Sequence, residues 1–465
     1  MFHYTTLLYW IAGVMDAYTS LPFVFCWVIL LLLVAYLSLY PSLFAVLMAH
    51  FRARSRFYFW SAPLLWAGLE YVRGFLLSGF PWENLGYSQY RWLHLIQISD
   101  IIGIYGLSAL IMSVNVAFFE IVQAIRRKRG FSWKPAMSVA FIVVCVLAYG
   151  TWRMAEIDQL AQTSPKMAVA LVQGNIDQSR KWVSSFQSET IRRYSRLTRM
   201  AMKSGPDLIV WPETALPFYF LYQEPLTREV LNLVRACRVY FLLGSPSFRK
   251  DRGNIEYYNS AYLLDPSGKV LGKYDKVHLV PYGEYIPLKR FFPFLGKVVE
   301  SAGDFKPGTE GQFLSMNKER IGVLICFEAI FPELSRAMAQ NGAQLLVNIT
   351  NDAWFGRSSA PYQHLSMAVF RAVENRRAVA RAANTGISAF IDPAGRIIDE
   401  TALFTEAVRT RSLPMMAEKT FYGSHGDLFA KASILITLIV CITLALSKNT
   451  QKERIGHPIG DRFTV

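Results

Sequence analysis

A cysteine and a glutamate occur where buried strands are expected to end, and a lysine occurs in a predicted loop. The cysteine is Cys326, which closes the apolar run 321–325 and precedes a helical pattern that begins at Pro332. A sharp turn from a strand into a helix exposes a nucleophile and directs backbone N–H groups toward a developing oxyanion. Because a free thiol is mostly protonated, Cys326 needs a general base and a positive neighbour to react.

Two further segments could supply that base and that positive charge. The run 207–213, DLIVWPE, is typical of a buried strand that ends in Glu213, and Pro212 makes the turn before this carboxylate rigid. The segment 274–287 places Lys276 in a loop. We therefore expect Glu213 to accept the thiol proton and Lys276 to stabilise negative charge.

Two more carboxylates accompany this set. Glu284 lies in the same loop as the lysine, and Glu328 follows the cysteine by two positions. Either could support the site, and either could instead pair with a neighbouring Lys or Arg. Cys326 also has two other interpretations, as a buried inert thiol or as one half of a disulfide with Cys237. The presence of both partner segments favours the nucleophile.

The composition predicts a membrane protein that carries a sizeable soluble part. Of the 465 residues, 52% are hydrophobic and only 18% are charged, which is too apolar for an ordinary soluble protein. The net charge of +15 does not indicate nucleic-acid binding, because Lys and Arg cluster beside apolar runs rather than in one basic tract. The five cysteines form no CxxC pair and no metal-ligand spacing. We therefore expect no metal, no cofactor and no nucleic-acid partner.

The apolar segments predict two membrane regions. Residues 1–152 are expected to form an N-terminal helix bundle of about five spans, and 428–447 a C-terminal span followed by a cytoplasmic tail, 448–465. The five N-terminal segments are 7–15, 21–48, 58–77, 95–125 and 136–149. The first of them is short and not basic, so we interpret it as retained rather than as a cleaved signal.

Basic clusters predict which side of the membrane each part faces. They occur at 51–56 and 126–129 and in the C-terminal tail, and Lys and Arg favour the cytoplasmic side. The segment between the two membrane regions must then lie outside the cytoplasm. Its apolar runs have strand length and alternate with amphipathic stretches, so residues 165–412 are expected to form an α/β domain. The predicted strands are 167–172, 207–211, 240–244, 260–265, 321–326, 344–349 and 387–391.

The contexts of the three side chains resemble a known superfamily. WPETALP around Glu213, YDKVHLVPYGEYIP around Lys276 and ICFEAIFPE around Cys326 are similar to the Glu-Lys-Cys triad of nitrilases. The flanking spans, with LSGFPW (77–82), LVQGNIDQSRKW (171–182) and NDAWFG (351–356), resemble the apolipoprotein N-acyltransferase family over nearly the whole chain. Members of that family usually have more spans before the catalytic domain than the five predicted here.

The resemblance implies a fold, an activity and a location. The fold would be a polytopic α-helical membrane domain plus an extracytoplasmic nitrilase-like α-β-β-α sandwich. The enzyme would take an acyl chain from a membrane phospholipid, in the family usually phosphatidylethanolamine, and transfer it to the N-terminal amine of a diacylated apolipoprotein. It would lie in a bacterial inner membrane with its catalytic domain on the periplasmic side.

The resemblance also implies roles for individual residues. Glu213 would be the proton acceptor, Cys326 the nucleophile and Lys276 the oxyanion stabiliser. Glu284 would orient Lys276 or the amine, and Glu328 would support the pocket. Two tryptophans, Trp182 and Trp82, occupy positions that lie near substrate in the family.

Two other functions remain compatible with the sequence. The chain could be a membrane-tethered nitrilase-type amidase, because the triad motifs also occur in soluble nitrilases. It could instead be a lipid-binding or transport protein without catalysis, although an intact triad disfavours that reading. The flanking spans and LSGFPW favour the acyltransferase over both.

Several secondary features carry hypotheses of their own. The aromatic loops 216–222 and 290–295 could be lids that dip into the membrane interface. The pair Glu70 and Arg73, one helical turn apart in a predicted span, is expected to form an intramembrane ion pair, or else to contact a lipid headgroup. His364, like His278, lacks a metal-ligand spacing and is expected to be a hydrogen-bonded structural residue.

Overall fold

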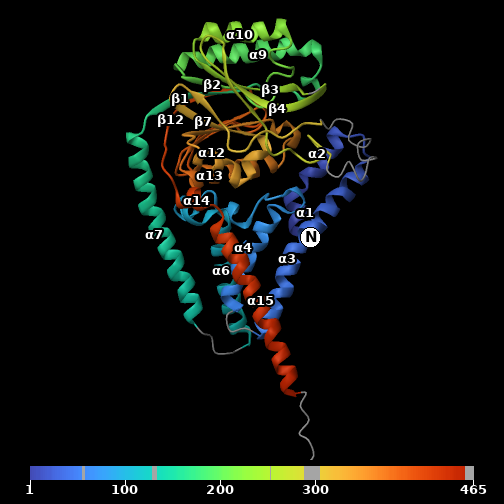
Figure 1. Cartoon of the computed structure of the whole chain (residues 1–465), viewed down its shortest axis with the longest axis vertical. Coiled ribbons are helices and arrows are strands. Elements are labelled where there is room, and N and C mark those ends of the chain that lie inside the picture. Colours follow the sequence, from blue (N-terminus) through green and yellow to red (C-terminus); the bar gives the residue numbers. More distant parts are fainter. Residues whose placement is uncertain (55–57, 128–132, 252, 287–303, 456–465) are drawn as a thin grey trace, which may run out of the picture.

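A helical part and an α/β part follow one another along the long axis of the molecule (Figure 1). The structure is a computed structural model that describes residues 1–465 except 55–57, 128–132, 252, 287–303 and 456–465. Two β-sheets face each other in the α/β part, and helices cover both outer faces. The predicted architecture, a helical part with candidate membrane spans plus an α-β-β-α sandwich, is confirmed.

The helical part contains four helices, among the described residues, that are long and apolar enough to cross a membrane. They are Phe23–Ala53, Ser99–Arg126, Trp133–Thr163 and Leu428–Leu446. They belong to α3 (Phe23–Arg54), α6 (Ser99–Arg127), α7 (Trp133–Thr163) and α15 (Leu428–Ile455).

Two of the expected spans differ from the prediction. The segment 7–15 is divided between α1 (Phe2–Leu8) and α2 (Trp10–Tyr18), and the segment 58–77 becomes the 16-residue helix α4 (Tyr58–Arg73). The chain leaves α4 after Arg73, and Leu77 and Ser78 adopt positive φ in the turn that follows. About 20 residues are needed for a full crossing, so α4 alone is too short.

Each sheet of the sandwich has six strands. The first sheet has the order β12-β1-β2-β3-β4-β5 and the second the order β11-β10-β9-β8-β7-β6. Strands β1, β2 and β3 are parallel, as are β7, β8 and β9, and the outer strands pair antiparallel. The first sheet comprises β1 (Lys166–Gln173), β2 (Leu208–Val210), β3 (Tyr240–Asp251), β4 (Asn254–Leu264), β5 (Val270–Asp275) and β12 (Ala407–Pro414). The second comprises β6 (Phe313–Met316), β7 (Glu319–Ile325), β8 (Leu345–Thr350), β9 (Ala378–Ala383), β10 (Ala389–Ile391) and β11 (Ile397–Glu400).

Two helices cover each outer face of the sandwich (Figure 1). The first sheet carries α9 (Ser184–Ala201) and α10 (Glu224–Cys237), and the second carries α12 (Pro332–Gln340) and α13 (Ala360–Asn375). Every residue of α13 except Tyr362 and Gln363 is buried, because the helix lies between the second sheet and the helical part. Helix α13 is therefore a shared core element of both parts.

A buried cluster of charges joins the two parts. Asp100 of α6 accepts hydrogen bonds from Arg153 of α7 at 2.8 Å and from Arg376, which directly follows α13, at 2.7 Å. The Asp100 and Arg376 side chains are 2% and 0% exposed. One carboxylate thus joins two cations from different parts of the fold, although Arg153 also pairs with Glu156 and Glu418.

We expect Asp100→Ala to lower the free energy of unfolding by about 3–5 kcal/mol, because it leaves a buried guanidinium without its counter-charge. Thermal unfolding of the purified protein in detergent measures the change. The control is Asp158→Ala, which removes the exposed partner of Arg396 and should cost at most about 1 kcal/mol. Equal effects of the two variants would contradict a stabilising role for the buried cluster.

One loop hypothesis is wrong and another lies outside the described residues. In the loop 216–222, Phe218 and Phe220 are 2% and 0% exposed and pack in the core under the first sheet. These rings therefore do not dip into a membrane, although Leu221 and Tyr222 are exposed. The segment 290–295 falls within the undescribed range 287–303.

Candidate functional site

The three predicted site residues come together at one end of the sandwich. Glu213 follows β2, Lys276 follows β5 and Cys326 follows β7 directly. The Lys276 Nζ lies 3.7 Å from Glu213 Oε1, and both charges act on the Cys326 thiol. All three are nearly covered, with exposures of 7%, 1% and 7%. Strands of the two sheets thus place a carboxylate, an ammonium and a thiol together in one buried site.

Cys326 sits in a strained turn. Its φ is +53°, in the left-handed region that a residue with a Cβ adopts only at a cost, and the short helix Cys326–Ile330 follows. Burial raises the pKa of the thiol, and the nearby Glu213 carboxylate raises it further against the opposing effect of Lys276. The resting thiol is therefore protonated and depends on a base to become a nucleophile.

The Glu213 carboxylate is held by two donors besides the lysine. Asn259 Nδ2 donates to Oε1 at 2.7 Å, and the backbone N–H of Asn351 donates to Oε2 at 2.8 Å. Hydrogen bonds to both oxygens fix the plane of the carboxylate. Asn351 begins the NDAWFG segment, which resembles a family motif. Asn259, in the middle of β4, lies in no motif that would have marked it as a site residue.

Lys276 is paired with a second carboxylate. Its Nζ lies 2.8 Å from Glu284 Oε2, and Glu284 in turn accepts from Val280 N at 2.8 Å and from Asn259 Nδ2 at 2.8 Å. Burial alone would lower the pKa of Lys276, but the carboxylates of Glu284 and Glu213 outweigh it and raise the pKa. The ammonium therefore stays charged, and Glu284 lies where it can orient it.

Glu328 connects the lysine loop to the cysteine turn. It is fully buried, and its oxygens accept from Ile325 N at 2.6 Å, Val277 N at 2.6 Å and His278 N at 3.2 Å, and from the Tyr274 hydroxyl at 3.0 and 3.1 Å. Burial raises its pKa to about 7, although the backbone donors oppose the shift. Its partners are thus mainly backbone N–H groups rather than a Lys or Arg.

We expect Glu328→Ala to lower the thermal midpoint strongly and to slow acyl transfer, because several buried N–H groups lose their acceptor at about 1–3 kcal/mol each. Thermal unfolding and activity are measured on the same preparation. Glu310→Ala, at an exposed position, is the matched control. A variant with normal stability and activity would show that Glu328 is dispensable to the loop.

A second buried network supports the cysteine turn from behind. His364 Nε2 donates to the Cys326 carbonyl oxygen at 3.0 Å, and Arg381 donates to His364 Nδ1 at 3.1 Å and to Asp352 Oδ2 at 2.7 Å. Burial and the adjacent Arg381 lower the pKa of His364 against the opposing effect of Asp352, whose Oδ1 lies 3.1 Å from Nδ1. The prediction that His364 is a hydrogen-bonded structural residue is confirmed, but its position behind the nucleophile was not foreseen.

The two tryptophans occupy different environments. Trp182 is 53% exposed, whereas Trp82 is 2% exposed and packs against Phe327, the residue after the cysteine, with ring centroids 6.4 Å apart. Trp82 Nε1 also donates to Gln363 Oε1 at 2.9 Å. Trp82 is thus part of the wall behind the turn, while Trp182 presents an open aromatic face.

The charges in α4 position the loop that carries Trp82. No contact of 4 Å or less joins Glu70 and Arg73, both of which the structure describes, so the expected ion pair is wrong. Arg73 donates to Tyr4 Oη at 2.9 Å and to the Trp82 carbonyl at 3.4 Å, and Glu70 accepts from Leu85 N at 2.7 Å. Each charge instead satisfies polar groups of neighbouring segments.

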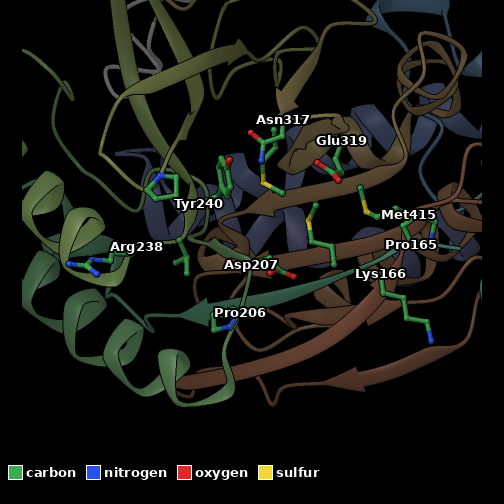
Figure 2. A pocket seen from close by; sticks show the side chains of 13 residues that line it. Pro165, Lys166, Pro206, Asp207, Arg238, Tyr240, Asn317, Glu319 and Met415 are labelled. Carbon is green, nitrogen blue, oxygen red and sulfur yellow. The ribbon is translucent and has the colours of Figure 1, made fainter.

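A cavity of about 330 Å³ lies at the opposite end of the first sheet (Figure 2). Its lining includes Lys166, Asp207 and Tyr240, which lie where β1, β2 and β3 begin. Ligands of parallel sheets bind at the other end, where the strands finish. Within the described ranges, no cluster of three His, Cys, Asp or Glu could hold a metal ion.

Comparison with known proteins matches both parts of the chain. The family model Carbon-nitrogen hydrolase matches residues 168–419, and Apolipoprotein N-acyltransferase N-terminal domain matches residues 1–117. The chain is 48% identical to an apolipoprotein N-acyltransferase of Geobacter metallireducens over 94% of this chain and 84% of that protein. It is 32% identical to an apolipoprotein N-acyltransferase of Chlorobaculum tepidum over 88% of this chain and 82% of that protein. Among solved structures, a carbon-nitrogen hydrolase from Helicobacter pylori is 17% identical, with a TM-score of 0.43 over 54% of this chain and 89% of that one.

Proposed function

The chain belongs to the apolipoprotein N-acyltransferase family, and we propose that its acyl transfer proceeds through a thioester on Cys326. It is a membrane enzyme whose substrates are, in general terms, phospholipids and lipoproteins. The observation that carries the mechanism is the buried cluster of Glu213, Lys276 and Cys326, in which the base, the cation and the thiol share one space.

In the first half-reaction, Glu213 takes the thiol proton and the sulfur attacks the ester carbonyl carbon of the phospholipid. The carbonyl oxygen becomes an oxyanion, which Lys276 and the backbone N–H of Phe327 stabilise. The bond between the carbonyl carbon and the glycerol oxygen then breaks, and Glu213 returns its proton to that oxygen. A lysophospholipid leaves, and the acyl chain stays on Cys326 as a thioester.

In the second half-reaction, the neutral N-terminal amine of the apolipoprotein attacks the thioester carbonyl. Glu213 accepts the proton that the nitrogen loses, and Lys276 again faces the oxyanion. The carbon–sulfur bond breaks, and the sulfur recovers the proton from Glu213. The products are an amide on the apolipoprotein and the free enzyme.

The orientation that we propose follows from the basic ends of the membrane helices. Helices α3, α6 and α15 end in or near basic clusters, and these ends lie at the side of the helical part away from the sandwich (Figure 1). Basic ends favour the cytoplasm. Together with the family membership, this supports a bacterial inner-membrane enzyme whose sandwich faces the periplasm.

The cost of moving acyl chains from a bilayer into water favours a site that is attached to membrane helices. The acyl donor and the lipidated acceptor are both anchored in a bilayer, and each CH₂ moved into water costs about 0.8 kcal/mol. A site next to the bilayer avoids that cost. We propose phosphatidylethanolamine as the donor, as is usual in the family.

Intact-mass spectrometry of the purified protein tests the mechanism. Incubation with phosphatidylethanolamine should add the mass of one acyl chain, and hydroxylamine should remove it because a thioester is labile to that reagent. Addition of a diacylated lipopeptide should also remove the adduct and yield a triacylated peptide. Hydrolysis of a small amide without any adduct from phospholipid would instead support the membrane-tethered amidase.

A further inference from the structure

A second lysine lies within the buried site and has no role in the reaction as described so far. Lys181 ends the short helix α8 (Gln178–Lys181) and is 2% exposed. Its Nζ donates to the backbone carbonyl oxygen of Glu213 at 3.3 Å. Helix α8 is tied to the site on its other side, because Asn351 Nδ2 donates to Gln178 Oε1 at 2.7 Å.

The surroundings of this ammonium differ from those of Lys276. Among the described residues, no carboxylate oxygen lies within 4 Å of Lys181 Nζ, whereas Lys276 has one at 2.8 Å and another at 3.7 Å. One of its three N–H groups is used by the Glu213 carbonyl. A buried cation without a paired carboxylate is costly, so its retention calls for a function.

The charge balance of the site identifies that function. Glu213 and Glu284 carry two negative charges, and Lys276 carries one positive charge. Protonated Lys181 makes these four groups neutral together. Without it they would carry one net negative charge, to which any charge on Glu328 would add. Proton transfer from Cys326 to Glu213 leaves the total unchanged, so a site without Lys181 would oppose both the thiolate and the oxyanion.

We propose that Lys181 is a second cationic residue of the acyl-transfer site, a positioning residue that holds the backbone at Glu213 and offsets the negative charge formed on Cys326 and on the substrate oxygen. This inference rests on the proposed mechanism. No bond to Lys181 forms or breaks, and its proton stays on the nitrogen throughout the cycle.

A charge role and a purely structural role differ in their pH dependence. Burial lowers the pKa of Lys181 to about 8, against the opposing effects of Glu213 and Cys326. The ammonium is therefore charged below about pH 8 and loses its proton as the pH rises through that value. The acylation rate of the wild type should fall over the same range, whereas a hydrogen bond to a carbonyl alone would produce no such decline.

The experiment compares variants of the full-length protein in detergent micelles with phosphatidylethanolamine. The rate of single-turnover acylation of Cys326 is followed by intact mass between pH 6 and 10. We expect Lys181→Gln, which keeps an N–H donor but loses the charge, to react roughly 100-fold more slowly and to lose the decline above pH 8. Lys181→Arg keeps the charge at all these pH values, so its rate should exceed that of the Gln variant and show no decline near pH 8.

Arg180→Gln is the matched control, because it removes one charge from an exposed position of the same helix and should change the rate less than twofold. Alkylation of Cys326 by iodoacetamide is a second measurement that needs no lipid, and Lys181→Gln should slow it as well. Wild-type rates and a wild-type pH profile for Lys181→Gln in both assays would overturn the inference. If the wild type formed no acyl adduct, the proposed mechanism would fail, and the alkylation rates would still decide the role of Lys181.

Discussion

Cys326→Ala should abolish the acyl adduct and reduce acyl transfer by roughly 10⁴-fold or more, because no other atom of the site can form the thioester. The variant should fold normally. Alanine and cysteine both carry a Cβ, so the strain of the left-handed turn at φ +53° is similar for both residues. Intact mass after incubation with phosphatidylethanolamine measures the adduct, and a lipopeptide assay measures the transfer.

The control for this prediction is Cys237→Ala, which removes another free and partly buried thiol at the end of α10. It should leave both the adduct and the transfer intact. An adduct that persisted in Cys326→Ala and disappeared in Cys237→Ala would place the nucleophile on the other thiol. Binding of phospholipid should survive in Cys326→Ala, which separates loss of chemistry from loss of substrate.

Glu213→Gln should slow the acylation of Cys326 by roughly 10³-fold, within the range that loss of a general base produces. An amide cannot take the thiol proton. It also fits the site poorly, because both oxygens of Glu213 accept from N–H donors, Asn259 Nδ2 and Asn351 N. The NH₂ group of glutamine must face one of them.

The single-turnover rate of acylation measures this effect. Glu224→Gln is the control, because Glu224 is 80% exposed and pairs with Arg228 on the surface of α10, and it should retain the wild-type rate. An unchanged rate in Glu213→Gln would show that another group deprotonates the thiol.

The buried strands could be predicted from the sequence, whereas the edges of the sheets could not. All seven predicted strands are present, and each contains a run of buried, mostly apolar residues. Four of the five strands that were missed, β5, β6, β11 and β12, mix buried or half-buried with exposed positions, so their sequences lack a long apolar run. The fifth, β9, is fully buried but consists largely of alanine, which has a low β-propensity.

The residues of the site also fall into those that the sequence could predict and those that it could not. Glu213 and Cys326 were recognisable because each ends or follows a predicted strand, and Lys276 was recognisable from its distinctive loop motif. Asn259 was not singled out, because nothing local distinguishes an asparagine within a strand. Lys181 was not singled out either, although it lies in the LVQGNIDQSRKW segment (171–182), because the segment alone assigns it no role. Their importance arises only from contacts across the fold, to the carboxylate and the carbonyl of Glu213.

The wrong expectation about the loop 216–222 has a physical explanation. Its density of aromatic residues indicated a membrane contact, but the fold uses Phe218 and Phe220 to fill the core between the first sheet and α10. Aromatic residues serve cores and interfaces equally well. Only the tertiary structure separates the two uses.

Because α13 is buried against both the second sheet and the helical part, it limits how the two parts of the protein can be separated. The helix holds the turn at Cys326 through His364 and is covered on its other face by α6 of the helical part. A sandwich expressed alone would expose that face to water and loosen the turn at Cys326. The catalytic half is therefore not an autonomous module, and a chimaera between two relatives should work only if α13 and the helices that cover it come from the same parent.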